Sequence, residues 1–277
     1  MHLFILITLT MIAFAMNSVL NRAAVDGGHA DATAFAMVRV LAGVVVLFMV
    51  MSVRRRGRLE VTSLRRWGGG LALAVYMIGF SLAYLSLDAG IGALILFGTV
   101  QICLFLQASM SGMQPTRAQI IGACVAFVGL LIALVPSTDA SASFSGALFM
   151  LAAGLGWAAY TLAGRGARDP VAATTSHFLL CLPFIVLLLT QPGQFMTPTG
   201  WGLAILSGGV TSGLGYALWY HVLPALPGAR AAIVQLSVPV LAIALGAVLL
   251  GEPIGFKVVL SALLVLGGIG YALRSHN

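Results

Sequence analysis

Charged residues are scarce in this sequence. Only 8% of its 277 residues are Asp, Glu, Lys or Arg, and 60% are hydrophobic, whereas an ordinary soluble domain carries about 25% charged residues. So few charges cannot cover the surface of a water-soluble protein of this size. The apolar excess must therefore face lipid, which excludes a soluble globular protein and predicts an all-α polytopic membrane protein.

Cysteine is scarce as well, and the motifs of nucleotide and redox chemistry are missing. Cys103, Cys124 and Cys181 fall in apolar runs without CxxC or Cys/His spacing, so neither a disulfide framework nor a metal site is indicated. We interpret the three as small core residues. The sequence has no Walker loop and no nucleophile with a base, which argues against ATP-driven pumping within this chain. We expect no cofactor, no metal and no enzymatic activity.

The net charge of +7 could indicate nucleic-acid binding, but the basic residues crowd into short loops between apolar runs. In membrane proteins that distribution is a signal of topology. We therefore expect membrane lipid and a small molecule as partners, and no nucleic acid.

Long apolar stretches divide the chain into candidate spans. A spanning helix needs about 20 apolar residues, and breaks at charge, Gly and Pro clusters leave ten stretches. They cover residues 2–22, 32–52, 68–87, 90–111, 118–135, 144–164, 173–191, 200–220, 229–250 and 256–274. Ala13-Phe14-Ala15 imitates a signal-peptidase site, but only His2 precedes the apolar stretch, so we treat the first span as retained.

The positions of Lys and Arg predict the orientation, because cytoplasmic loops are enriched in both. With the N-terminus inside, the outer side holds only Arg22 and Lys257, and Arg39 lies within a span. The cytoplasmic segments hold the other basic residues, Arg54, Arg55, Arg56, Arg58, Arg65, Arg66, Arg117, Arg165, Arg168, Arg230 and Arg274. Most acidic residues fall on the outer side, namely Asp26, Asp31, Asp88, Asp139 and Glu252. We therefore predict a protein of the bacterial cell inner membrane with both termini in the cytoplasm.

The chain also repeats itself, since residues 89–135 align with residues 227–273 at a constant offset of 138. The matched pairs are Gly90 with Gly228, Gln114 with Glu252, Pro115 with Pro253 and Gly129 with Gly267. We interpret the pattern as two five-helix halves, residues 1–137 and 138–277. Because five is odd, the second half enters the membrane upside down, which is the inverted-repeat plan of many secondary transporters. That plan predicts alternating access around a central site between the halves.

Several motifs resemble those of a known family. The run from Pro239-Val240-Leu241 to Leu249-Leu250-Gly251-Glu252-Pro253 is similar to the helix-9 signature of EamA-type exporters in the drug/metabolite transporter superfamily. Trp157-Ala158-Ala159-Tyr160 and the intramembrane Arg39 also match, and the resemblance covers the whole chain. In the first half, Gln101 replaces the usual proline and Met113-Gln114-Pro115 replaces Gly-Glu-Pro, as in aromatic amino acid exporters. The resemblance implies a five-plus-five helix fold and export of neutral or aromatic amino acids, with another metabolite or drug class as the alternative.

Two polar side chains lie within the spans of the first half. A charge at the bilayer centre costs about 2.5–3.5 kcal/mol on insertion scales, so Arg39 must be paired or face water. It could attract a substrate carboxylate, tie its helix to a neighbouring carbonyl or to Asp26 or Asp31, or snorkel to the interface. Asn17 lies about two thirds along its span and must face the interior, where it lines the pathway or only packs.

Aromatic residues recur at helical spacing in two spans. They are Tyr76, Phe80 and Tyr84 in the third span, and Tyr216, Trp219 and Tyr220 in the eighth. Residues four apart share a helix face, and two such stripes facing one cavity would stack on apolar or aromatic solutes while their hydroxyls bind polar groups. Core packing is the alternative reading. For Tyr84, Trp219 and Tyr220, near helix ends, an interfacial aromatic belt is the favoured one.

Three further residues complete the candidate substrate-binding set. Trp157 and Tyr160 lie beside Gly154 and Gly156, which allow close helix approach, so the two rings line the cavity or only pack. Gln101 is an amide in an apolar helix and needs a partner or water. The full candidate set is Asn17, Arg39, Tyr76, Phe80, Tyr84, Gln101, Trp157, Tyr160, Tyr216 and Trp219.

Coupled carriers commonly keep a carboxylate within the membrane, but near the spans we find only Glu252, at a helix end, and His177 as a further titratable candidate. This favours facilitated diffusion or exchange down the solute's own gradient. A membrane-embedded enzyme would need acidic or His residues clustered at one membrane face, whereas here the carboxylates are scattered. A channel or a scaffold subunit is the remaining alternative.

Overall fold

The structure is a computed structural model that describes residues 2–54, 57–110, 116–134, 144–164, 167–187, 194–222, 225–226 and 234–274. Every long element in these ranges is a helix, as the all-α prediction requires. The elements are α1 (His2–Val25), α2 (Ala32–Arg54), α3 (Leu64–Ala83), α4 (Ala89–Met110), α5 (Arg117–Leu134), α6 (Phe144–Gly164), α7 (Pro170–Val186), α8 (Pro198–Ile205), η2 (Leu206–Leu214), α9 (Gly215–Val222), α11 (Ser237–Leu250) and α12 (Phe256–Arg274). The π-helix η2 joins α8 to α9 without a break, so these three form one rod.

Each predicted span corresponds to one helical rod. The predicted ranges 144–164 and 256–274 agree with α6 and α12 at both ends, whereas α3 begins and ends before the predicted 68–87. Four helices are long and apolar enough by themselves to cross a membrane, Leu3–Val25, Ala32–Arg54, Ala89–Gln107 and Phe144–Gly164. The other apolar helices are shorter in the described part of the chain.

Some residues on which the repeat and the orientation depend lie outside the described ranges. These are Arg55, Arg56, Met113, Gln114, Pro115, Asp139, Arg165, Gly228 and Arg230. The side chain of Tyr220 is outside the description as well.

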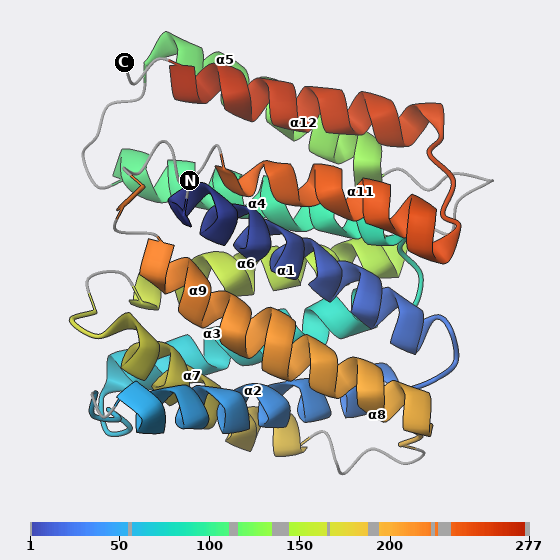
Figure 1. Ribbon diagram of the computed structural model, residues 1–277. Helices are drawn as coiled ribbons and strands as arrows, with labels where there is room; N and C mark the ends of the chain where they lie inside the picture. The colour runs from blue at the N-terminus through green and yellow to red at the C-terminus, as the bar shows by residue number, and fades with distance from the viewer. Residues whose placement is uncertain are drawn as a thin grey trace.

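The rods lie side by side in a stack of layers (Figure 1). α5 and α12 pack against each other at the top of the view, α4 and α11 form the next layer, and α2 and α7 lie at the bottom. α1, α3, α6 and the α8–η2–α9 rod fill the middle, where α3 packs on α6 and α1 packs on the rod. This middle of the stack is therefore the part of the protein that is shielded from lipid on most sides.

Local sequence signals explain several helix ends. Asp169 accepts hydrogen bonds from the backbone N–H groups of Val171 and Ala172 at the start of α7, and Pro170 occupies the first helical position, where a missing N–H costs nothing. α11 ends at Gly251, whose φ of 70° lies in the left-handed region, the usual glycine stop of a helix.

One glycine sets how closely two helices approach. A Cβ at Gly208 in η2 would collide with the backbone carbonyl oxygen of Arg39 in α2. Only a residue without a side chain allows the two backbones to cross at this distance. The crossing brings the polar side chains of η2 next to the buried part of α2.

Candidate functional site

Aromatic rings from five helices meet in the middle of the stack. We call these rings the ring cluster. Trp157 lies at its centre, with ring centroids 4.9 Å from Tyr76, 5.0 Å from Tyr216 and 5.3 Å from Tyr160. Such distances are those of favourable aromatic pairs. The members are Phe14, Tyr76, Phe80, Tyr84, Trp157, Tyr160, Phe178, Tyr216 and Trp219.

The structure corrects the prediction of an interfacial belt for Tyr84 and Trp219. Their exposed fractions are 0% and 7%, and Tyr84 packs edge-on against Phe80 while Trp219 packs against Phe14. Proximity to a helix end in the sequence misled the prediction, because the neighbouring helices cover these ends. Both residues belong to the buried ring cluster.

Arg39 is fully buried within α2, next to Tyr76 and Phe80 of the ring cluster. Its Nε donates to the Ser212 hydroxyl and its Nη2 to the Tyr76 hydroxyl, both at 3.1 Å. The guanidinium carbon lies 5.5 Å from the centroid of the Tyr76 ring and 4.9 Å from that of Phe80, within the range of a cation–π interaction. Two readings of the sequence are therefore wrong: Arg39 does not snorkel, and it does not tie α2 to Asp26 or Asp31.

Asn17 connects α1 to the π-helix. Its Oδ1 accepts hydrogen bonds from Ser207 at 2.9 Å, from Ser212 at 3.2 Å and from Thr211, and its Nδ2 donates to the Thr211 carbonyl at 3.3 Å. The Ser212 hydroxyl thus links Asn17 to Arg39. π-Helices occur frequently at functional sites, and here the π-helix directs three hydroxyls toward one amide. The sequence-based placement of Asn17 on an interior face is consistent with this network.

Gln101 and His177 lie apart from the hydrogen bonds of Arg39. Gln101 is half-buried in α4, and its amide nitrogen has no hydrogen-bond partner among the described residues. Among the described residues, no ring contact and no hydrogen bond joins Gln101 to the ring cluster. His177 is fully buried in α7 and packs edge-on against Tyr160, with centroids 5.3 Å apart.

Several side chains of this site were missed by sequence reasoning. Phe14 and Phe178 complete the ring cluster, and Ser207, Thr211 and Ser212 bind Asn17. The hydroxyls carried a usable signal, because small polar residues and glycines interrupt the apolar eighth span at Ser207–Gly213. Phe14 and Phe178 carried none, since a phenylalanine in an apolar helix is as common on the lipid side as inside.

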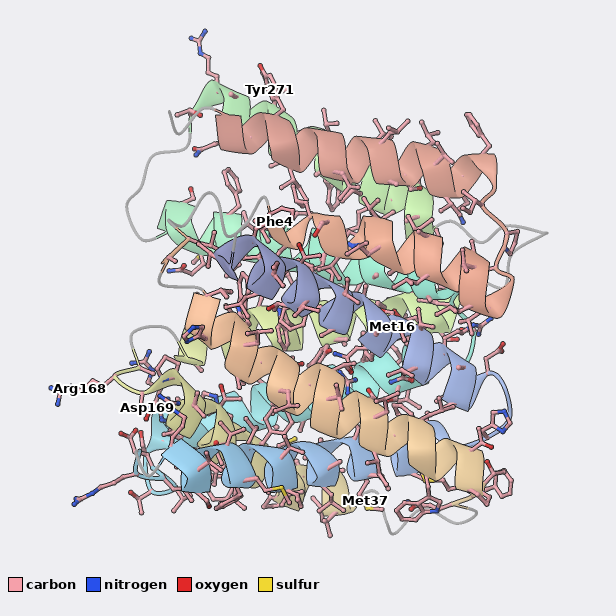
Figure 2. The ribbon with its side chains drawn as sticks, in the orientation of Figure 1. Phe4, Met16, Met37, Arg168, Asp169 and Tyr271 are labelled. Carbon is pink, nitrogen blue, oxygen red and sulfur yellow. The ribbon has the colours of Figure 1, made fainter. Side chains whose placement is uncertain are left out.

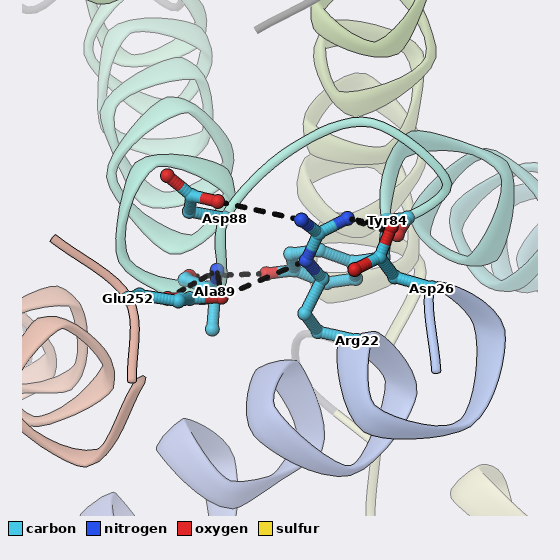
Figure 3. Close-up of polar contacts among 6 residues, drawn as sticks. All are labelled: Arg22, Asp26, Tyr84, Asp88, Ala89 and Glu252. Atoms are coloured by element: carbon cyan, nitrogen blue, oxygen red, sulfur yellow. Dashed lines mark hydrogen bonds and ion pairs between the residues drawn. The ribbon is translucent and has the colours of Figure 1, made fainter. Parts of the chain in front are cut away.

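A charged cluster covers one end of the stack (Figure 3). Arg22 at the end of α1 contacts Asp26 at 2.9 Å, Asp88 at 3.4 Å and Glu252 at 3.7 Å. Glu252 also accepts from the backbone N–H of Ala89 at the start of α4, with the shorter bond at 2.7 Å. The cluster therefore links α1 and α4 to the connection between α11 and α12.

Asp88 and Glu252 of this cluster lie outside the helices and are mostly buried. Burial raises the pKa of both carboxyl groups above their usual values, although Arg22 lowers both. Desolvation disfavours the charged form of a carboxyl group, and three carboxylates here share one arginine. The two groups therefore take up a proton at a higher pH than exposed carboxylates do.

A polar cavity lies at the opposite end of the stack, where Arg168 and Asp169 are labelled in Figure 2. Its volume is about 400 Å³. Its charged lining residues are Arg58, Glu60, Arg65, Arg66, Arg168 and Asp169. α7 leads from Ser176 in the wall of this cavity to His177, which packs on Tyr160, and to Phe178 of the ring cluster.

Of the three cysteines, only Cys181 is buried, Cys103 is half-buried and Cys124 is exposed. The prediction that all three are core residues is therefore wrong for Cys124, whose apolar helix turns that side toward lipid.

An apolar helical stack in which four helices are long enough to cross a bilayer is that of a multi-pass membrane protein. The comparisons with known proteins specify it further: the pattern of the EamA-like transporter family matches residues 144–274. A Pseudomonas aeruginosa relative, described as an uncharacterized protein, is 45% identical over 272 residues, which cover 97% of this chain and 93% of that protein. The chain belongs to the EamA-like transporter family of the drug/metabolite transporter superfamily.

More distant relatives agree with this assignment. A protein of Salmonella typhimurium described as a probable amino-acid metabolite efflux pump is 26% identical over 230 residues, 77% of each chain. A solved crystal structure superposes with a TM-score of 0.68 at 20% identity, covering 96% of this chain and 97% of that chain. At that identity the superposition supports the fold alone.

Proposed function

We propose that the protein is a secondary transporter that exports small metabolites from the cytoplasm, first among them neutral or aromatic amino acids. The observation that supports this most is the ring cluster. Its rings come from α1 and α3 of the first half of the chain and from α6, α7 and α9 of the second. Aromatic rings with a few polar groups beside them are the common lining of a small-molecule site.

The proposed mechanism is alternating access between two inverted five-helix halves, residues 1–137 and 138–277. Helices at corresponding positions of the halves pack against each other: α2 with α7, α4 with α11 and α5 with α12. A pseudo-two-fold axis in the membrane plane would produce this pairing. The solute site then lies near the axis, where the two halves can rock against each other.

We further propose that the protein crosses the bacterial inner membrane ten times with both termini in the cytoplasm. The arginine-rich cavity at the end formed by α2, α3, α6 and α7 would face the cytoplasm, as the enrichment of arginine on that side requires. The charged cluster of Arg22, Asp26, Asp88 and Glu252 would face outward and close the outer end of the protein. In this arrangement the solute enters from the polar cavity along α7.

The candidate residues named from the sequence fit this proposal to different degrees. Asn17, Arg39, Tyr76, Phe80, Tyr84, Trp157, Tyr160, Tyr216 and Trp219 belong to the ring cluster or bind polar groups next to it. Gln101 stays a candidate for the pathway only.

Counterflow in proteoliposomes tests the function. Purified protein would be reconstituted in liposomes loaded with unlabelled amino acids, and the uptake of labelled amino acids from a panel of neutral, aromatic and charged types would be followed. We expect saturable uptake that is fastest for neutral or aromatic members. Linear uptake would indicate a channel, a preference for a different solute class would reassign the substrate, and no uptake of any solute would end the proposal.

A further inference from the structure

Arg39 carries a buried positive charge that no carboxylate balances. Its exposed fraction is 0%, and the two groups that accept its hydrogen bonds, the hydroxyls of Ser212 and Tyr76, are neutral. No ion pair in the described part of the chain includes Arg39. A buried charge without a partner of opposite sign is costly, and within a membrane it marks a functional site by default.

Donors without acceptors surround this charge. The Nη1 of Arg39 and the hydroxyl of Tyr216 are both buried and have no hydrogen-bond partner among the described residues. Tyr216 lies near this charge, because its ring and that of Tyr76, the residue that accepts from Arg39, both pack on Trp157. Nη1 supplies two N–H groups and accepts nothing, and the Tyr216 hydroxyl can donate one O–H or accept, so donors exceed acceptors in the free capacity of these two groups.

The neighbouring acceptor is already occupied. The Oδ1 of Asn17 accepts hydrogen bonds from Ser207, Thr211 and Ser212, so it has no lone pair left for an ammonium group. A cationic solute would meet the like charge of Arg39, whereas an anionic oxygen would meet an opposite charge and up to three donors. The site therefore selects by charge as well as by shape.

We infer that Arg39 and the Tyr216 hydroxyl bind a carboxylate group of the transported molecule. The rings of Trp157, Tyr160 and Phe80 then pack on its apolar or aromatic body. A single guanidinium matches a singly charged carboxylate, and because Nε and Nη2 are already engaged, the hydroxyl of Tyr216 supplies the second hydrogen bond. The substrate class is thus small carboxylates and zwitterions with an apolar body, to the exclusion of organic cations. This inference rests on the proposed transport function.

The test is a competition experiment with three molecules that differ in one group. Phenylalanine carries both a carboxylate and an ammonium group, 3-phenylpropionate carries only the carboxylate, and phenylethylamine carries only the ammonium group. In wild-type proteoliposomes we expect the first two to inhibit counterflow of a labelled amino acid and phenylethylamine to inhibit at least ten-fold less well. Equal inhibition by 3-phenylpropionate and phenylethylamine would overturn the inference.

Variants assign the discrimination to Arg39. A charge-assisted hydrogen bond contributes about 1.5–3 kcal/mol, so Arg39→Gln should weaken inhibition by 3-phenylpropionate about ten- to hundred-fold and leave inhibition by phenylethylamine unchanged or stronger. Arg39→Lys should restore part of the discrimination, and Tyr216→Phe should reduce it several-fold. The matched control is Arg54→Gln at the exposed end of the same helix, which should leave the ratio unchanged.

A binding measurement separates this inference from the transport proposal. A saturable change in tryptophan fluorescence on adding 3-phenylpropionate, absent with phenylethylamine, supports the carboxylate site even where no flux occurs. Flux without charge discrimination overturns the carboxylate site and leaves the transport proposal standing. If Arg39→Gln does not fold, as judged by size-exclusion chromatography, the wild-type ratio decides by itself.

Discussion

Replacing Asn17 by alanine tests the link between α1 and the π-helix. The change removes the common acceptor of three hydroxyls, those of Ser207, Thr211 and Ser212. Thr211 loses least, because its hydroxyl also bonds to the Ser207 carbonyl at 2.9 Å. Hydrogen bonds contribute about 0.5–1.5 kcal/mol each, and those between membrane helices average about 0.6 kcal/mol. We expect Asn17→Ala to lower the free energy of unfolding by about 2 kcal/mol.

Thermal unfolding in detergent measures this loss in a Cys103→Ser/Cys124→Ser background, with a thiol-reactive dye that reports exposure of the buried Cys181. For a protein of this size about 2 kcal/mol corresponds to a decrease in Tm of roughly 4–8 °C. Thr8→Ala is the matched control, since Thr8 lies on the same helix, is exposed and bonds only to its own helix through the Phe4 carbonyl. It should change the stability by less than about 0.5 kcal/mol.

A double-mutant cycle makes the test specific. If Asn17 and Ser207 interact directly, the destabilisation by Ser207→Ala should largely disappear in the Asn17→Ala background. Additive effects of the two substitutions, or a loss below about 0.5 kcal/mol for Asn17→Ala, would refute the described network.

Three further predictions follow from the same structure. Gly208→Ala should destabilise the protein by about 1–3 kcal/mol through overpacking against the backbone of α2. Gly202 lies on the same rod, but a Cβ added there meets no atom within 4 Å. Gly202→Ala should therefore be neutral or stabilising in the same unfolding assay. Burial raises the pKa of Glu252 in the folded protein. The protonated Glu252 carboxyl therefore contributes stability that is fully present below the pKa of Glu252 in the unfolded chain and is lost as pH rises through its pKa in the folded protein. The Tm of wild type relative to Glu252→Gln should therefore increase as pH falls through the folded-state pKa toward the usual carboxyl range, and a constant difference would contradict this. Alanine at each of three rings of the ring cluster should lower transport several-fold with membrane insertion retained, while Trp201→Ala on the exposed side of α8 should not. The three rings are Phe80, Trp157 and Tyr216.

Much of the fold follows from the sequence because the signal for a membrane helix is strong. Twenty apolar residues in a row leave few alternatives to a helix, so α6 and α12 were predicted at both ends. The end of α3 was placed too late, because the apolar run continues through Tyr84 into the connection before α4. The π-helix was not predicted; it packs against α1 and α2, and the sequence does not give such contacts between distant helices.

The candidate site was predictable where a polar or aromatic residue is rare in its surroundings. Arg39 and Asn17 stand out in apolar helices, and both have polar partners inside the protein. The partners on η2 could not be identified, because they lie more than 170 residues away in the sequence and the distance depends on how α1, α2 and η2 cross. Burial of Tyr84 and Trp219 depends on neighbouring helices in the same way.

The central claim is that a solute binds among the rings between the two halves of the chain. The sequence has four tryptophans, and Trp67 and Trp201 are partly exposed while Trp157 and Trp219 belong to the ring cluster. In a Trp67→Phe/Trp201→Phe protein only the two cluster tryptophans fluoresce. A solute that shows counterflow should change their emission with saturation at the concentration that half-saturates transport. Transport of that solute without any change in this emission would contradict the claim.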